Sequence, residues 1–238
     1  MKINIMTWNT GISELRETFN KERADEELRK IMNYVDGFLQ NKENPIVFLQ
    51  QMVYKDPDNN YKYHLYYNEF IKNFNTKYDI KYYEKSKFMM TVAIAGKNQM
   101  KTLSNEYYPV DKPRNRAIAV EFNGVSFLCI HANGKSVEND AYLKSLHGKA
   151  DIILGDFNAG NYLKSENRNT FNSILKEHVC ICNTPTRIEA KNGRMTCIDH
   201  VFIRLCDVTK CSKLFVHEEV NLSDHFPITF EYIKEKMH

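Results

Sequence analysis

The sequence lacks several features that mark specialised classes of protein. No apolar run approaches the roughly 18 residues that a membrane-spanning helix needs, and the chain begins directly in a strand-like segment. None of the six cysteines forms a C-x-x-C pair of the kind that binds zinc. We therefore expect a reduced cytoplasmic protein with no membrane partner, because disulfides persist mainly in oxidising compartments.

The chain also has little charge imbalance and nothing that reads as a linker. No Pro-, Gly- or Ser-rich stretch or low-complexity tract interrupts its 238 residues. We therefore predict a single domain over residues 1–238, present as a monomer. The net charge of +3 is too small to identify a nucleic-acid partner by itself, so local clusters such as residues 112–116 matter more.

Hydrophobic periodicity predicts an α/β protein. Over residues 13–40, apolar residues recur mostly every three or four positions among charges, which indicates an amphipathic helix with Ser13 as its cap. Asn123-Gly124 lies between two apolar runs and is a strong hairpin signal. Shorter helices are expected at 68–75, 137–146 and 169–177, and strands at 2–8, 45–49, 89–95, 117–122, 125–130, 151–154, 197–203 and 228–232.

Short polar motifs follow or interrupt these apolar runs. The ends of strands are where open α/β sheets place their chemistry. Carboxylates, amides and imidazoles that meet there can hold a divalent cation, orient a water and stabilise a phosphate. In chain order, the motifs are Thr7-Trp8-Asn9, Leu49-Gln50-Gln51, His131-Ala132-Asn133, Gly155-Asp156-Phe157-Asn158, Ile198-Asp199-His200 and Ser223-Asp224-His225.

In residue type and order, the six motifs resemble those of the endonuclease/exonuclease/phosphatase superfamily, which includes deoxyribonuclease I and the exonuclease III type of AP endonuclease. The resemblance runs nearly end to end. It implies a four-layer α/β sandwich of two packed mixed β-sheets with helices on the outside. It also implies a magnesium-dependent nuclease, with Mn²⁺ as a possible replacement, that hydrolyses phosphodiester bonds by in-line attack of an activated water.

The resemblance assigns roles to the polar side chains. Asp156 orients or deprotonates the water, and the Asn158 amide donates to the developing charge on the phosphate. Asp199 accepts a hydrogen bond from His225 and favours its charged form. His131 is a second phosphate-binding imidazole. Two plainer interpretations stay open: Asp156 bonds only local backbone amides in a turn, and His131 is a core histidine.

The expected metal site departs from the pattern of the superfamily. There, the acidic residue of a Leu-Gln-Glu motif is the main metal ligand, aided by the Asn that ends the first strand. Here the corresponding residues are Gln51 and Asn9, and Asp224 is a further candidate. An amide oxygen carries no net charge, so a hard cation should bind more weakly. The explanations are an engineered substitution, which we favour because the other motifs are intact, a natural variant that uses other acids, and a pseudoenzyme.

Basic residues beside the motifs are candidates for substrate binding. Arg114 and Arg116 precede the strand at 117–122, and Arg187 precedes Asp199, while Asn133 completes its motif. Arginine suits phosphate because its planar donors pair bidentately, although each could be a solvated loop charge. We expect a nucleic-acid substrate, with DNA favoured over RNA. The alternatives are a pseudoenzyme that binds nucleic acid or a protein partner, and a phosphatase or phosphodiesterase acting on a small molecule.

Overall fold

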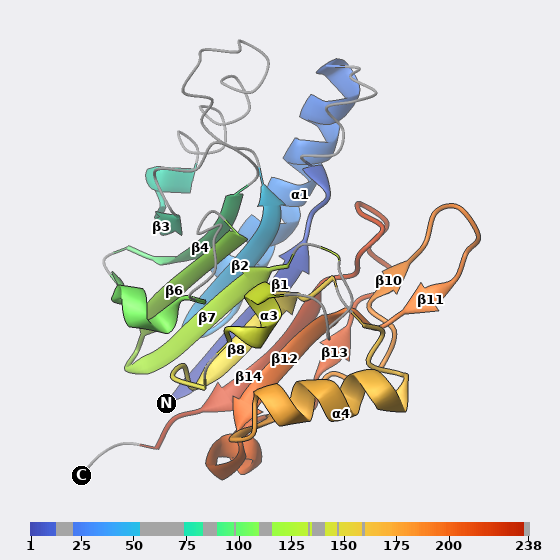
Figure 1. Cartoon of the computed structure of the whole chain (residues 1–238). Coiled ribbons are helices and arrows are strands. Elements are labelled where there is room, and N and C mark those ends of the chain that lie inside the picture. Colours follow the sequence, from blue (N-terminus) through green and yellow to red (C-terminus); the bar gives the residue numbers. More distant parts are fainter. Residues whose placement is uncertain are drawn as a thin grey trace.

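The computed structural model describes most of the chain. The described residues are 1–12, 21–52, 74–82, 90–97, 99–109, 116–132, 134, 141–146, 148–158 and 160–235. Among them, the strands form two six-stranded sheets and one separate pair, β10 (Arg187–Ile188) with β11 (Met195–Thr196) (Figure 1). Within this described part, no helix is long and apolar enough to cross a membrane.

The first sheet has the strand order β13-β14-β1-β2-β4-β3. Its two long central strands, β1 and β2, are parallel, and its other neighbours are antiparallel, so the sheet is mixed. The bounds are β1 (Lys2–Asn9), β2 (Pro45–Met52), β3 (Tyr78–Tyr82), β4 (Met90–Gly96), β13 (Phe215–Val216) and β14 (Ile228–Ile233).

The second sheet has the order β5-β6-β7-β8-β12-β9 and is also mixed, because β7 and β8 are parallel while its other pairs are antiparallel. The bounds are β5 (Met100–Thr102), β6 (Ala117–Phe122), β7 (Val125–His131), β8 (Ile152–Asp156), β9 (His178–Cys180) and β12 (Asp199–Arg204). Two 3₁₀ helices, η2 (Asn105–Tyr107) and η5 (Leu205–Lys210), lie between strands.

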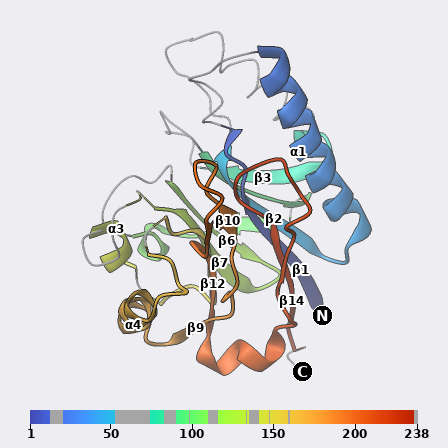
Figure 2. The ribbon, with the colours of Figure 1, turned by 90° about the vertical axis from the view of Figure 1, so that its right-hand side faces the viewer.

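The two sheets pack face to face around an apolar core, in which the ring centroids of Phe48 and Phe127 lie 5.4 Å apart. Helix α1 (Lys21–Asn41) covers the outer face of the first sheet with Leu28, Ile31 and Val35. The helices α3 (Ala141–Lys144) and α4 (Ser165–Ile174) lie on the opposite side of the molecule (Figure 2). Central strands such as β2 and β8 are buried on both faces because both faces are covered. The predicted four-layer α/β sandwich is confirmed.

Most predicted elements are present, with shifted ends. The Asn123-Gly124 hairpin is confirmed: both residues have positive φ, 52° and 70°, and Phe122 pairs with Val125. The helix predicted at 169–177 was placed too late, since α4 runs over Ser165–Ile174 and buries only Phe171, which leaves little apolar periodicity to read. Ser13, residues 137–140 and most of the helix predicted at 68–75 lie outside the described residues.

Candidate active site

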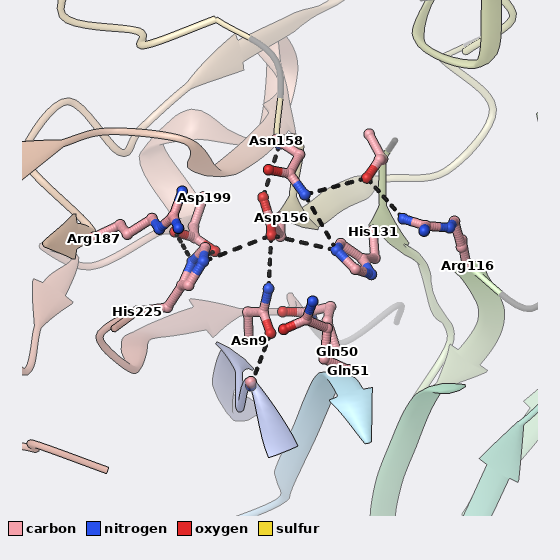
Figure 3. Close-up of polar contacts among 12 residues, drawn as sticks. Asn9, Gln50, Gln51, Arg116, His131, Asp156, Asn158, Arg187, Asp199 and His225 are labelled. Atoms are coloured by element: carbon pink, nitrogen blue, oxygen red, sulfur yellow. Dashed lines mark hydrogen bonds and ion pairs between the residues drawn. The ribbon is translucent and has the colours of Figure 1, made fainter. Parts of the chain in front are cut away.

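Three polar side chains lie next to one another across adjacent strands of the second sheet. The register of β7 and β8 pairs His131 with Asp156, and the register of β8 and β12 pairs Asp156 with Asp199. Directly paired residues point to the same face of a sheet. All three side chains are buried, and they meet where β7 and β8 end and β12 begins (Figure 3). The sheet itself therefore assembles the centre of the site.

Asp156 is held at both of its carboxylate oxygens. Asn9, at the end of β1 in the other sheet, donates from Nδ2 to Asp156 Oδ2 at 2.7 Å, and the backbone N–H of Asn158 donates to Oδ1 at 2.8 Å. Burial raises the pKa of Asp156 to about 7; His225 opposes the rise, and Asp199 adds to it. Asp156 therefore makes the local turn bond of the plainer interpretation, but its other oxygen faces the site.

The backbone places Asn158 differently from expectation. The two-residue spacing of Asp156 and Asn158 predicts that an extended segment directs both side chains to one side, but β8 ends at Asp156 and Asn158 has a φ of +51°. The turn after β8 instead places the side-chain amide of Asn158 beside His131 and Ala132. Asn158 Nδ2 lies 3.3 Å from His131 Nε2 and donates to the Ala132 carbonyl at 3.4 Å. Asp156 and Asn158 therefore both lie at the site, as predicted, but the predicted extended backbone between them is wrong.

His225 and Asp199 form a buried pair. His225 Nδ1 lies 2.9 Å and 3.0 Å from the two oxygens of Asp199. Burial alone would lower the pKa of His225, but the carboxylates of Asp199 and Asp156 raise it to about 9. The imidazole is therefore protonated at neutral pH. Its Nε2 points toward Asp156 Oδ2, 3.9 Å away (Figure 3).

His131 has the opposite electrostatic character. Burial lowers the pKa of its imidazole, and the positive charges of Arg116 and His225 lower it further. A neutral His131 Nε2 lies 3.6 Å from Asp156 Oδ2. Arg116 donates to the Ala132 carbonyl at 3.0 Å, so this guanidinium is anchored to the end of β7 beside the site. The site thus combines one neutral and one charged imidazole on the two sides of one carboxyl group.

The three residues expected to hold a cation surround Gly11. A Cβ at Gly11 would lie 3.9 Å from Gln51 Oε1 and 4.0 Å from Asp224 Oδ1, and the Gly11 N–H donates to Asn9 Oδ1. All three donors are oxygens, the atom type that magnesium prefers. Only Asp224 is an acid, and its Oδ2 accepts from Arg187 Nε at 2.8 Å. The donors therefore fit a magnesium ion by type but offer it little net negative charge.

A second arrangement of possible metal ligands exists at the centre of the site. One ligand atom from each of Asp156, Asp199 and His225 lies within 4.8 Å of the others. A metal needs a deprotonated imidazole, whereas His225 is engaged by Asp199 at Nδ1 and is protonated at neutral pH. The cation site at Asn9, Gln51 and Asp224 stays a prediction.

Two supporting residues were not predicted from sequence. Thr186 Oγ1 donates to Asp199 Oδ2 at 2.7 Å and accepts from the backbone N–H groups of Ile198 and Asp199. Trp8 Nε1 donates to the His225 carbonyl at 3.0 Å. Thr186 lies in a polar loop with no periodic signal. The indole of a buried tryptophan needs an acceptor, and that requirement was the available clue for Trp8.

The structure brings together Asn9, Gln51, His131, Asp156, Asn158, Arg187, Asp199 and His225, with Arg116 at the edge (Figure 3). Asp224 joins them through its ion pair with Arg187, which was expected to bind substrate. Arg114 and Asn133 lie outside the described residues. The catalytic and binding roles of these residues stay predictions.

Comparison with known proteins rests on three-dimensional structure. No family model matches the sequence, and no curated protein does. The 3′-5′ exonuclease NExo of Neisseria meningitidis is similar, with a TM-score of 0.64, 18% identity and coverage of 96% of this chain and 99% of NExo. An AP endonuclease of Archaeoglobus fulgidus has a TM-score of 0.62 and 14% identity, covering 97% and 99% of the two chains.

A third similar structure is D. rerio TDP2 in complex with a single-strand DNA product, with a TM-score of 0.63, 16% identity and coverage of 98% of this chain and 99% of TDP2. Identities this low establish the fold alone. The chain therefore has the fold of the endonuclease/exonuclease/phosphatase superfamily, as its motifs predicted.

Proposed function

We propose that this protein is a magnesium-dependent nuclease that hydrolyses phosphodiester bonds by in-line attack of an activated water. The observation that carries the proposal is the pairing of Asp156 with His225. Their side chains approach to 3.9 Å in a buried site, with pKa values of about 7 and about 9. Between those values, a carboxylate base and an imidazolium acid coexist, which is what general acid–base hydrolysis requires.

The remaining groups have complementary tasks. Ionised Asp156 accepts the proton of the water and directs its attack, while its bond from Asn9 fixes the carboxylate. Asn158 and protonated His225 donate to the phosphate oxygens as they gain charge. Neutral His131, held by the Asn158 amide, adds a second imidazole to the phosphate site. Thr186 and Asp199 keep the His225 ring in one orientation.

Asn9, Gln51 and Asp224 are the residues that would hold the magnesium ion. When bound, the ion supplies a Lewis acid that neutralises charge on the phosphate and the leaving oxygen. The neutral amide of Gln51 and the pairing of Asp224 with Arg187 both weaken attraction for a cation. We therefore expect low magnesium affinity and slow turnover in the protein with Gln51, while Arg116, Asn158 and His225 keep their capacity to bind phosphate.

Nucleic acid is the favoured substrate, and DNA is favoured over RNA. Support comes from similar structures that contain DNA products: the Neisseria 3′ phosphatase NExo with a DNA hairpin, and D. rerio TDP2 with single-strand DNA. Arg116 and Arg187 place two guanidinium groups beside the site, and such groups suit a phosphate backbone. A binding-only pseudoenzyme and a small-molecule phosphatase or phosphodiesterase remain the competing proposals.

The Asp156→Asn variant tests the proposal. We expect cleavage of a labelled DNA hairpin in magnesium to fall by ~100- to 10,000-fold, the usual contribution of a general base. The control is Asp207→Asn, the same change at a buried acid that pairs with Lys210 outside the site, and it should cleave normally. Thermal unfolding confirms that both variants fold. Unimpaired cleavage by Asp156→Asn would remove its role as base.

A substrate panel separates the competing functions. The protein and its Gln51→Glu variant are assayed against DNA, RNA and small phosphate esters in magnesium and in manganese. We expect cleavage of nucleic acid, stronger in Gln51→Glu. If neither form cuts any of these substrates while the protein still binds nucleic acid, the binding-only proposal replaces ours. Hydrolysis of the small esters alone would favour the phosphatase proposal.

A further inference from the structure

A groove that shares no residue with the candidate active site runs along the outer face of the first sheet, beside α1. Outward-facing residues of β1 and β14 form its floor. One wall is α1, and the other is the segment around β13. It consists of two adjoining cavities of about 430 and about 340 Å³, both lined by Phe38, Lys42 and Thr229. Cavities of a few hundred Å³ are the size that holds small organic molecules.

The exposed surface of the groove is mainly apolar, although eight of its fourteen lining residues are polar or charged. Met6 and Tyr34 line the larger cavity, and Phe215 and Phe230 line the smaller one, with Phe38 between them. The Phe215 side chain is 57% exposed, although its strand neighbours in β14 are largely covered. Phe230, in contrast, is buried in the core, so Phe215 is the aromatic residue that remains largely in water at this concave surface. The groove therefore favours a ligand with an apolar body.

Gly37 keeps the larger cavity open. It lies in the interior of the 21-residue helix α1, where glycine is among the least favourable residues. Nothing lies within 4 Å of the position that its Cβ would occupy, so no close packing explains the glycine. Because Gly37 lines the cavity, a larger side chain there would project into the groove. The absence of a side chain at Gly37 leaves the larger cavity open beside α1.

The smaller cavity carries positive charge. Lys42 and Lys213 both line it, and among the described residues neither ammonium group has a carboxylate oxygen within 4.0 Å. The described lining contains one acid, Glu231, which is paired with Lys2 at 3.1 Å. Two ammonium groups that have no carboxylate partner within the described part of the chain, set beside apolar walls, complement an anionic head on an apolar body.

We propose that this groove binds a small organic anion, an aromatic or aliphatic carboxylate. The apolar body lies along α1 over Gly37 and Phe38, and it packs against Phe215. The carboxylate interacts with Lys42 and Lys213. The apolar walls supply most of the affinity, since exposed ion pairs contribute little on their own, and the two lysines select for the charge.

Nuclear magnetic resonance titration with 2-naphthoate tests the proposal. We expect saturable shifts of the backbone amide signals of Gly37, Phe38 and Lys42. The uncharged analogue 2-naphthylmethanol has the same ring system and should bind about two- to five-fold more weakly, the effect of losing exposed ion pairs. The absence of saturable shifts with 2-naphthoate, or equal affinity for the two compounds, would overturn the proposal.

Variants locate the site and its charge. Gly37→Leu adds a good helix former and fills the open space, so it should raise the unfolding temperature and abolish naphthoate binding. The double change Lys42→Gln with Lys213→Gln should weaken naphthoate to the affinity of the alcohol. Lys176→Gln, an exposed lysine after α4, is the matched control and should leave binding unchanged. Unaltered binding by Gly37→Leu would place the ligand elsewhere and refute the groove assignment.

Discussion

At the scale of single residues, two buried groups determine what the site can do. Asp156 has a pKa of about 7 because burial disfavours its charged form, and His225 has a pKa of about 9 because two carboxylates stabilise its charged form against burial. Below pH 7 the carboxyl is neutral, and above pH 9 the imidazole is neutral. The combination that the proposed mechanism requires, Asp156 without its proton and His225 with one, therefore exists in a limited pH range.

The pH dependence of cleavage follows from this pair. We expect a bell-shaped profile with apparent pKa values near 7 and near 9. In Asp199→Asn, the carboxylate that stabilises the imidazolium is lost, so the pKa of His225 falls and the alkaline limb moves to lower pH. Asp207→Asn should keep the native profile. An alkaline limb that stays in place in Asp199→Asn would contradict the assignment of that limb to His225.

The sequence motifs included most of the residues that meet at the site, but they did not predict the side chains that hydrogen-bond to those residues and hold them in place. The motifs around Asp199 and His225 predicted a contact that the structure contains. Thr186 was not predicted, because its hydroxyl bonds Asp199 only after the polar loop that carries it folds against this residue. The ion pair between Arg187 and Asp224 was also missed, since it joins residues far apart in the chain that come together through an isolated bridge between Arg187 and His225.

At the scale of elements, the site depends on how closely strands approach. Gly155 precedes Asp156 in β8 and has a φ of +121°. A Cβ there would collide with the Ile130 carbonyl oxygen on β7. Glycine is therefore required for β7 and β8 to pair at the point where they carry His131 and Asp156.

A substitution at Gly155 tests this requirement. We expect Gly155→Ala to lower the free energy of unfolding by at least about 3 kcal/mol, because backbone strain adds to a clash with backbone atoms. The control is Gly193→Ala: Gly193 also has positive φ, +68°, but nothing lies within 4 Å of its added Cβ, so the loss should be about 1 kcal/mol. Urea denaturation measures both. Equal losses would show that close strand pairing is unimportant at Gly155.

Several long strands were predictable because both of their faces are buried, which produces a continuous apolar run such as that of β8, while β14 alternates buried and partly exposed residues. The short strands β3, β5, β9, β10, β11 and β13 were not predicted. They contain two to five residues and depend on backbone pairing with a neighbour, as β13 does with β14. Such pairing leaves little trace in local sequence.

At the scale of the whole molecule, the site lies where the two sheets meet. Asn9 of the first sheet binds Asp156 of the second, and Trp8 in β1 binds the backbone of His225. The similar solved structures share only 14–18% identity with this chain. Short motifs at strand ends were enough to predict the fold, because their residue types and order resemble those of a superfamily that has this fold. Between the motifs, the fold requires apolar residues at buried positions but not particular ones, so sequence identity can be low.

The measurement that tests the central claim most directly is a magnesium titration of DNA cleavage by the protein and its Gln51→Glu variant, with Gln99→Glu as a control that adds the same charge at an exposed position. We predict cleavage by all three proteins, with the midpoint magnesium concentration at least about tenfold lower in Gln51→Glu, because a carboxylate joins the hard-cation site. Equal rates and equal magnesium dependence for the unchanged protein and its Gln51→Glu variant would show that this position does not hold the cation. Absence of cleavage in every form would contradict the proposed nuclease function.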